Sequence, residues 1–521
     1  MFSRDINVLL RTLDVRRVPV PCATGAQAQA VERDARRACS RALRVPPLSE
    51  RRAQPAAYDA LVRERMRDLE AILLAQRDPE ARALDIVCAL CEQSRWAAGA
   101  GEPFEDDAHP EIDLQAADMA ALLSWAWHMR AGAPCLDDPR VHARMLHEVM
   151  RRVIRPLLAH EDYVCSVAAL CSAATALILL EDDGHNLGAA LRPLLRRLDA
   201  ACACAEETRA PLEDVLLDAC ALSDLARLMS MATAGAVDLT QEAPSATMLD
   251  ELLFGYVQDD WFFTCTRGAA RPAVSGAALY RLGRFCGDGA LRALGAALSR
   301  ARALPSPTVT GRLLDAAVHE EMEGEPAIAP RLRHAALEDG RLMVARGAGF
   351  FCGLTTGGDC ANAGDICVFL ERACVLSGGN LPIAQRARPA TPPLPDWDFS
   401  DDERAVMSVE VTPAYPPEAQ VRAHQRTLML SRGEYGAQLV DVFDFEQPRA
   451  LEYVFRSPFR PERGKSGARF GPMLLSWEGE PQLGERRVAP DEAFADGQWE
   501  LTLRYPQVDK RAAFTFFMRH A

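Results

Sequence analysis

The sequence predicts an α+β chain of at least two domains, a helical domain followed by an antiparallel β-sandwich. Three observations indicate this. The 521 residues are too many for a single hydrophobic core. Apolar residues recur at helical spacing up to about residue 305, and alternate as in strands from about residue 426 onward. The stretch 304–330 is poor in pattern and holds four prolines, so we expect the domain boundary there.

Broad apolar stripes predict the helical domain. Within residues 140–160, one row of apolar side chains starts at Met145 and a second at Leu146, and both recur at every fourth position. Breaks rich in Gly, Pro and Asp separate such stretches, which indicates antiparallel helical hairpins. Several helices are apolar on both faces, so we expect layers or a ring rather than a lone bundle. The other predicted helices cover residues 58–76, 114–129, 166–180, 187–203, 212–232, 278–286 and 291–303.

Alternation of apolar and polar side chains predicts the β-sandwich. Residues 426–430 and 437–443 alternate on either side of a glycine-containing turn, the pattern of a β-hairpin. Several short strands with turn residues between them favour a sandwich. Further strands are predicted at residues 450–456, 499–505 and 513–519.

Composition narrows the classes of function. A hydrophobic content of 49% and a charged content of 25% are ordinary for a globular protein. No apolar run is long enough to span a bilayer, and the first residues lack the features of a secretory signal. We therefore expect a cytoplasmic protein with no membrane partner. The net charge of −14 argues against a nucleic-acid partner.

The sixteen cysteines do not predict disulfides or a metal site. Many lie inside apolar helical stretches, as Cys171 does, which is typical of free thiols in a reducing compartment. Cys88 with Cys91 and Cys202 with Cys204 form close pairs, but neither has a second pair at zinc spacing, so we interpret Cys88 and Cys91 as thiols on a buried helix face. No metal and no cofactor are expected.

Several stretches occur in an order that resembles a known family. They are ATAGAVDL at 232–239, DDWFF within 256–268, LYRLGRFCGD at 279–288, and AYP followed by DVF at 414–416 and 441–443. Together they resemble the heparinase II/III-like polysaccharide lyases over roughly residues 90–521. The resemblance implies an (α/α) toroid of helical hairpins followed by an antiparallel β-sandwich. It places a helical extension of the toroid at 1–90, the toroid at 91–320 and the sandwich at 331–521.

The resemblance also implies a chemistry whose groups have been replaced. Lyases of this family cleave uronic-acid glycans by β-elimination, which needs a group that neutralises the carboxylate, a base and an acid. The family's asparagine segment falls near His160, Glu161 and Tyr163, and its tyrosine segment falls near Asp214, so the expected asparagine and tyrosine are missing there. By position, these four residues are the candidate catalytic groups.

The family's histidine segment has also changed. It falls on residues 361–365, where alanines replace both histidines while Asn362 and Asp365 remain. Loss of one such group typically lowers the rate by about a hundredfold or more. Loss of all of them predicts that no useful elimination survives.

Aromatic and arginine side chains are candidates for sugar binding, since rings stack on sugars and guanidinium groups pair with carboxylates and sulfates. The alternative for the aromatic residues is a place in a core, and for Arg267, Arg271 and Arg281 a solvated surface. Histidines without metal spacing, such as His128, are expected to be surface or partner-bonded residues. The candidate substrate-binding residues are Tyr256, Trp261, Arg267, Asn362, Asp365 and Trp397.

Three functions are therefore open from the sequence. The leading hypothesis is a catalytically inactive lyase-like protein that binds an acidic polysaccharide or oligosaccharide, or a protein partner, in the inherited cleft. The second is an active lyase with acid–base groups rebuilt around His160, Glu161, Tyr163 and Asp214. The third is a structural or assembly protein that forms a homo-oligomer.

Overall fold

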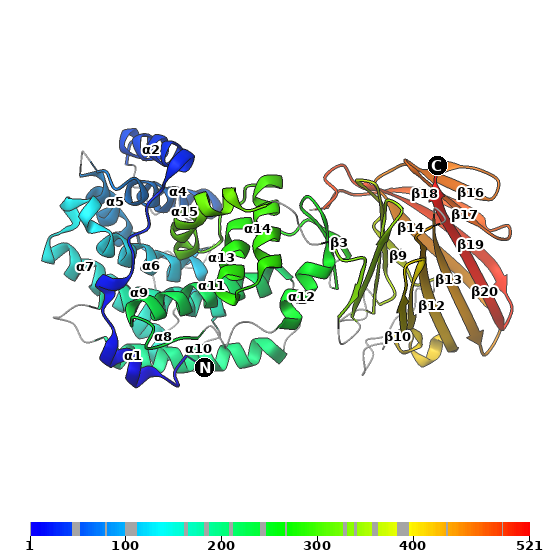
Figure 1. Cartoon of the computed structure of the whole chain (residues 1–521), viewed down its shortest axis with the longest axis horizontal. Helices are drawn as coiled ribbons and strands as arrows, with labels where there is room; N and C mark the ends of the chain where they lie inside the picture. The colour runs from blue at the N-terminus through cyan, green and yellow to red at the C-terminus, as the bar shows by residue number, and fades with distance from the viewer. Residues whose placement is uncertain are drawn as a thin grey trace. The chain divides into compact units, whose positions relative to one another are not determined.

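The computed structural model divides the chain into two compact units. The first comprises Met1–Pro244 and Val274–Ala329, and the second comprises Ser245–Ala273 and Pro330–Ala521. Helices make up the first unit and strands dominate the second (Figure 1). The structure describes residues 2–43, 53–78, 81–98, 112–160, 165–181, 187–207, 212–239, 246–265, 268–326, 331–337, 341–356, 363–382, 395–433, 436–491 and 493–521.

The predicted helices of the first unit are confirmed, with ends that differ by a few residues. Helix α9 is buried along its whole length, as its uniformly apolar sequence requires. No helix within the described ranges is long and apolar enough to cross a bilayer. The helices are α1 Ile6–Thr12, η1 Val15–Arg17, α2 Gly25–Ser40, α4 Pro55–Ala75, α5 Arg82–Cys91, α6 Leu114–His128, η2 Arg130–Gly132, α7 Pro139–Val149, α8 Arg155–Ala159, α9 Val167–Leu180, α10 Gly188–Glu207, α11 Leu212–Ala232, α13 Gly276–Cys286, α14 Gly289–Ala301 and α15 Val309–Gly324.

Helices α6, α9 and α11 run in the same direction. Near their N-terminal ends, the Cys165 thiol lies 3.7 Å from the Ile112 carbonyl, and the Ala168 amide donates to Asp218 at 3.0 Å. One turn further, Ser172 donates to the Asp118 carboxylate at 2.8 Å. The C-terminal ends of these three helices therefore meet at the other end of the unit. Parallel inner helices with antiparallel partners form the expected (α/α) toroid.

A buried arginine joins three of these helices. Arg281 on α13 is only 3% exposed, and its guanidinium pairs with Asp224 on α11 at 2.9 Å and with Asp315 on α15. The interpretation of Arg281 as a solvated residue is therefore wrong. A charge so deeply buried needs partners, and the two carboxylates supply them.

The stretch 304–330, where the sequence predicts the domain boundary, holds one more helix of the first unit. Helix α15 occupies Val309–Gly324 and starts at Thr308, whose side chain accepts a hydrogen bond from the Gly311 amide at 3.0 Å. The helix is acidic toward its C-terminus, which obscures the apolar stripe in its first turns.

The second unit is a sandwich of antiparallel sheets. An eight-stranded sheet has the order β10-β11-β12-β13-β20-β17-β16-β15, and a four-stranded sheet has the order β18-β19-β14-β9. A five-stranded sheet, β4 to β8 in sequence order, shares one core with both. The strands are β4 His334–Ala336, β5 Leu342–Gly347, β6 Phe350–Thr355, β7 Ile366–Leu370, β8 Ala373–Leu376, β9 Gly378–Asn380, β10 Pro395–Ser400, β11 Arg404–Glu410, β12 Val421–Ser431, β13 Gly436–Phe445, β14 Arg449–Ser457, β15 Glu462–Arg463, β16 Gly467–Phe470, β17 Met473–Trp477, β18 Gln482–Val488, β19 Gln498–Val508 and β20 Arg511–His520.

A segment that precedes α13 in the chain packs with this second unit. It contains α12 Ala246–Gly255 and a small sheet of β1 Tyr256–Gln258, β2 Trp261–Thr264 and β3 Gly268–Ala270. The ring of Phe263 lies 6.4 Å from Phe351, edge to face. Phe263, Phe351 and their neighbours form a second core on the outer side of the five-stranded sheet.

Buried charges lie in the core of the sandwich. Arg426 forms two hydrogen bonds with Asp441, each of 2.8 Å, and donates to the Gly364 carbonyl at 2.7 Å. The His424 ring donates from Nε2 to Asp441 at 3.1 Å and accepts at Nδ1 from the Tyr415 hydroxyl at 2.9 Å. Burial alone would raise the pKa of Asp441, but the Arg426 guanidinium and His424 hold this pKa below its ordinary value.

Candidate functional site

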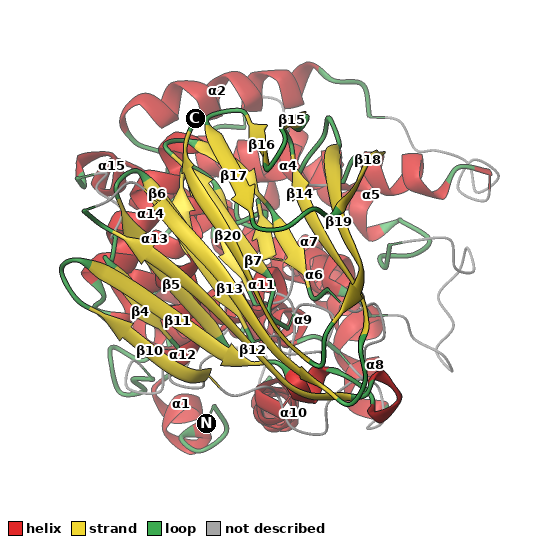
Figure 2. Cartoon of the chain, turned by 90° about the vertical axis from the view of Figure 1, so that its right-hand side faces the viewer, coloured by secondary structure: helices red, strands yellow, loops and turns green. Residues whose placement is uncertain are grey.

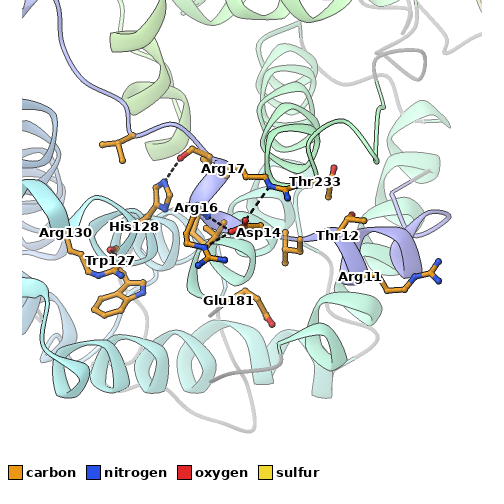
Figure 3. A pocket seen from close by; sticks show the side chains of 15 residues that line it. Arg11, Thr12, Asp14, Arg16, Arg17, Trp127, His128, Arg130, Glu181 and Thr233 are labelled. Atoms are coloured by element: carbon orange, nitrogen blue, oxygen red, sulfur yellow. Dashed lines mark hydrogen bonds and ion pairs between the residues drawn. The ribbon is translucent and has the colours of Figure 1, made fainter. Parts of the chain in front are cut away.

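A cavity of about 920 Å³ opens in the helical unit where α6, α9 and α11 end (Figure 3). The N-terminal segment between α1 and α2 forms one wall. The other walls come from the last residues of the three parallel helices and from η2. The lining residues are Arg11, Thr12, Leu13, Asp14, Val15, Arg16, Arg17, Val18, Val20, Trp127, His128, Arg130, Leu179, Glu181 and Thr233.

Hydrogen bonds on both sides of α1 hold the N-terminal part of the chain against α10, α11 and α6. The Phe2 and Ser3 amides donate to Asp199 of α10 at 2.6 and 2.9 Å. The Asp14 amide donates to the Ala232 carbonyl at the end of α11, at 2.8 Å. The Val18 carbonyl accepts a hydrogen bond of 3.0 Å from His128 Nε2 at the end of α6. The cavity therefore has a fixed wall although this wall has little regular structure.

Two arginines of this wall share one carboxylate. Asp14 accepts hydrogen bonds from the Arg16 backbone amide at 3.2 Å and from Arg16 Nε at 2.9 Å, and its other oxygen lies 3.4 Å from Arg17 Nε. The hydrogen bond from Arg16 lowers the pKa of Asp14, so the carboxylate is charged at neutral pH. The side chains of Arg16 and Arg17 are 79% and 48% exposed, so both side chains reach solvent. Figure 3 shows the three side chains gathered beside Thr233.

A further arginine stands on an aromatic ring at the opposite wall. The Arg130 guanidinium lies 4.0 Å from the centre of the Trp127 ring, and the His142 ring stacks on the same indole at 4.1 Å. Arg130 also pairs with Asp137 at 2.9 Å. Cation–π contact and stacking fix the position of this cation.

The lining is cationic in a strongly acidic chain. It holds four arginines and two carboxylates, Asp14 and Glu181, whereas the whole chain carries −14. Burial lowers the pKa of His128, so its ring adds no charge at neutral pH. Arginines at helix C-termini also offset the partial negative charge of the free carbonyls. The planar guanidinium group matches the geometry of carboxylate and sulfate, and the cavity has the volume of a small-molecule site.

Of the four predicted catalytic residues, the structure describes His160 and Asp214, and neither lines this cavity. His160 follows α8, and its carbonyl accepts a hydrogen bond of 2.8 Å from Arg197. Asp214 is exposed in the first turn of α11, whereas Thr233 of the cavity follows the last turn. A rise of 1.5 Å per residue separates them by about 28 Å along the helix. Glu161 and Tyr163 lie outside the described residues.

The predicted aromatic sugar-binding residues lie in the second unit. Tyr256 is 3% exposed and packs edge to face against Phe262. Trp261 contacts Phe369 at 5.5 Å and Phe494 at 5.2 Å, which places it beside the core, the alternative that the sequence left open. Trp397 belongs to β10 and pairs with Ser408 in backbone register; its side chain lies outside the described part.

Of the remaining predicted binding residues, the structure describes Asp365. Asp365 is half-buried, and its carbonyl accepts a hydrogen bond of 3.0 Å from the Thr355 amide. Arg267 and Asn362 lie outside the described residues. Arg271 pairs with Asp260 at 2.8 Å.

Two further features bear on cofactors. In the part of the chain that the structure describes, no group of three or more His, Cys, Asp or Glu side chains is arranged to hold a metal ion. The cysteines described are free thiols, and Cys88 is exposed, so the prediction that it lies on a buried face is wrong. Cys91 is buried, as predicted.

The cavity residues were not singled out from the sequence. The sequence pattern that marks this wall is Asp14-Val15-Arg16-Arg17 between two helices, in which a helix-capping aspartate precedes two arginines. Its significance depends on residues that lie more than a hundred positions away, such as His128 and Thr233. No spacing rule connects such distant positions.

Known proteins match this chain through structure and not through sequence. No family model and no curated protein matches it. Chondroitin AC lyase of Streptomyces coelicolor A3, in a mutant form, aligns with a TM-score of 0.57 and 12% identity over 99% of this chain and 82% of that chain. The same enzyme in complex with chondroitin sulphate gives a TM-score of 0.55. Paenibacillus xanthan lyase gives 0.55 at 9% identity, over 95% of this chain and 57% of the lyase. The chain therefore has the fold of these polysaccharide lyases, a helical toroid followed by an antiparallel β-sandwich.

Proposed function

We propose that this protein binds an acidic oligosaccharide in the cavity of its helical unit and does not cleave it. The observation that carries the proposal is the lining of that cavity, in which four arginines outnumber two carboxylates inside an acidic chain. The inherited fold supports a carbohydrate ligand, because one solved relative in structure is a complex with chondroitin sulphate.

The ligand class follows from the shape of the guanidinium group. The side chains of Arg16 and Arg17 are 79% and 48% exposed beside Asp14, and Arg130 is held on the Trp127 ring. Guanidinium groups form paired hydrogen bonds with carboxylate and sulfate groups, whereas a neutral sugar carries no anionic group to pair with them. The proposed ligand is therefore an oligosaccharide that carries uronate or sulfate groups.

We propose that the protein does not cleave its ligand, because β-elimination needs a group that neutralises the carboxylate, a base and an acid. The family's asparagine, tyrosine and histidine segments hold other residues in this sequence. In the cavity, His128 uses its Nε2 hydrogen for the Val18 carbonyl, so its only free ring nitrogen is Nδ1. The lining residues that the structure describes include no asparagine and no tyrosine, so this imidazole lacks the side chains that accompany histidine in the family.

Binding is tested by calorimetric titration of the full chain with oligosaccharides of chondroitin sulphate, heparin and hyaluronan, and with a neutral oligosaccharide. The double variant Arg16→Ala, Arg17→Ala is expected to lose about tenfold or more in affinity, or about 1.4 kcal/mol. Arg140→Ala is the matched control, since Arg140 contacts the capping carboxylate of Asp138 as Arg16 contacts that of Asp14 but lies outside the cavity. Equal losses in both variants would contradict the proposal.

Cleavage is tested by the ultraviolet absorbance of the unsaturated product on the same glycans. Sustained turnover, reduced by His160→Ala, would establish the rival function of an active lyase with rebuilt groups. If the protein neither binds nor cleaves any acidic glycan, the remaining candidate is an assembly protein. The proposal also includes a cytoplasmic location, supported by cysteines that lie inside apolar helices such as α9.

A further inference from the structure

In the described strands, the middle of the outward side of the eight-stranded sheet holds no charged residue, and charged residues lie at the two ends of its strands. Strand register places alternate residues of β11, β12, β13, β20 and β17 on this side, opposite the buried core (Figure 2). We call these residues the neutral face. They are Val406, Ser408, Gln425, Thr427, Met429, Gln438, Val440, Val442, Ser476, Ala513, Thr515 and Phe517.

The neutral face exposes apolar side chains. Val442 is 47% exposed, and Leu474, which borders the face, is 40% exposed. The only other large apolar side chains this exposed in the described chain are Val20 and Leu332. Because a quarter of all residues are charged, twelve neighbouring positions without one charge form an unusual surface. Depletion of charge at the centre is the mark of a protein–protein interface.

Three polar side chains of the neutral face are already hydrogen-bonded to one another. The hydroxyls of Ser408 and Thr427 lie 2.9 Å apart on neighbouring strands. The Gln425 side chain donates to Ser408 at 3.2 Å. Covering these groups costs little, since their hydrogen bonds persist when water leaves.

Charges lie at the two ends of the strands. Arg404 and Arg519 lie at one end of β11 and β20. Glu410 and Asp444 lie at the opposite end of β11 and β13, where Arg511 is 3.4 Å from Asp444. A two-fold axis that runs across the strands reverses the strand direction of a second copy. It thereby places the arginine end of one sheet over the carboxylate end of the other.

We propose that two copies of this chain associate through their neutral faces. Antiparallel sheets pack face to face with interdigitated side chains, and a two-fold dimer buries the same patch on both subunits. Five strands about 4.8 Å apart and about six residues long give a face of about 500 Å². With its charged border, this approaches the roughly 800 Å² per partner of a stable interface. An acidic glycan is a poor occupant, because the cations on this side lie at the end of the strands, where Arg519 is 5.6 Å from the centre of the Phe517 ring.

The test is the mass of the full chain in solution. Sedimentation equilibrium from low to high micromolar concentration is expected to give twice the 57.0 kDa of one chain. Val442→Glu and Thr515→Glu, each placing a carboxylate on the neutral face, are expected to return the mass to that of a single chain. Leu332→Glu is the matched control, because Leu332 is 40% exposed outside the face. The control is expected to keep the doubled mass.

Two outcomes of this experiment would overturn the proposed dimer. A wild-type protein that stays at the mass of one chain at every concentration overturns the proposal. So does a doubled mass that persists in both carboxylate variants. Thermal unfolding of each variant separates a lost interface from a lost fold, and the two sites provide independent variants. Because the neutral face lies in the second unit, glycan binding in the helical unit is tested separately.

Discussion

Asp14 accepts a hydrogen bond of 2.9 Å from Arg16 on the wall of the arginine-lined cavity. The same carboxylate lies 3.4 Å from Arg17, so one internal anion serves two cations. An incoming carboxylate or sulfate therefore meets guanidinium groups that already have a partner. Asp14 holds both cations in place and also competes with the ligand for them.

The first prediction concerns this competition. Asp14→Asn keeps an oxygen to cap η1 but removes the charge, so the affinity for an acidic oligosaccharide is expected to rise by up to about fivefold, or about 1 kcal/mol. Calorimetric titration measures the change. Asp138→Asn, in the similar pair with Arg140, is the control and should have no effect. Weaker binding by Asp14→Asn would show that orientation of the arginines outweighs competition.

The second prediction concerns the arginine buried between α11, α13 and α15. Arg281→Ala leaves Asp224 and Asp315 as buried charges without their partner, so the free energy of unfolding is expected to fall by about 3–5 kcal/mol. Arg284→Ala, one turn later on α13, removes an exposed pair with Glu321 and is expected to cost at most about 1 kcal/mol. Thermal unfolding compares the two, and equal losses would contradict the assignment.

The third prediction concerns acid. Burial lowers the pKa of His424 below its ordinary 6.5, while Asp441 and Arg426 act in opposite directions on it. The unfolded chain thus takes up a proton before the folded chain does, and stability is lost as the pH falls below about 6.5. His424→Gln is expected to flatten this loss, whereas His520→Gln, on an exposed residue, is expected to leave it unchanged. Melting temperatures across that pH range provide the measurement.

The fourth prediction has the opposite sign. Asp118 accepts hydrogen bonds from Ser172 and from the Val309 amide, and burial raises its pKa to about 7. The wild type therefore loses stability as the pH rises from about 4 to about 7, because only the unfolded chain ionises freely. Asp118→Asn removes this cost, so its stability relative to wild type is expected to improve from about pH 5 to about pH 8, by on the order of 1–3 kcal/mol. A difference independent of pH would contradict the raised pKa.

Periodicity predicted most helices and the longest strands because each has one buried face. Helix α11 was predicted with the bounds that it has, and the hairpin of β12 and β13 alternates strictly. Strands β5 and β6 were not predicted from the sequence, because both of their faces are buried. Met343 belongs to the sandwich core and Leu342 to the core beneath α12, so both sides are buried and no alternation remains.

The candidate site was less predictable than the fold. Trp127 and Glu181 end two different helices, and only the parallel arrangement of α6 and α9 brings them to one cavity. The motifs pointed instead to Asp214, at the other end of α11. A single sequence reports local periodicity, whereas a cavity depends on which helix ends meet.

Residues 245–273 belong to the second unit, although the residues on either side of them belong to the first, and this has a consequence for gene fusion. The chain passes from one unit to the other three times, after residues 244, 273 and 329. A single cut after 329 would leave the small sheet of β1 to β3 on the wrong fragment, with Phe263 parted from Phe351. A gene fusion with one junction therefore neither adds nor removes either unit cleanly.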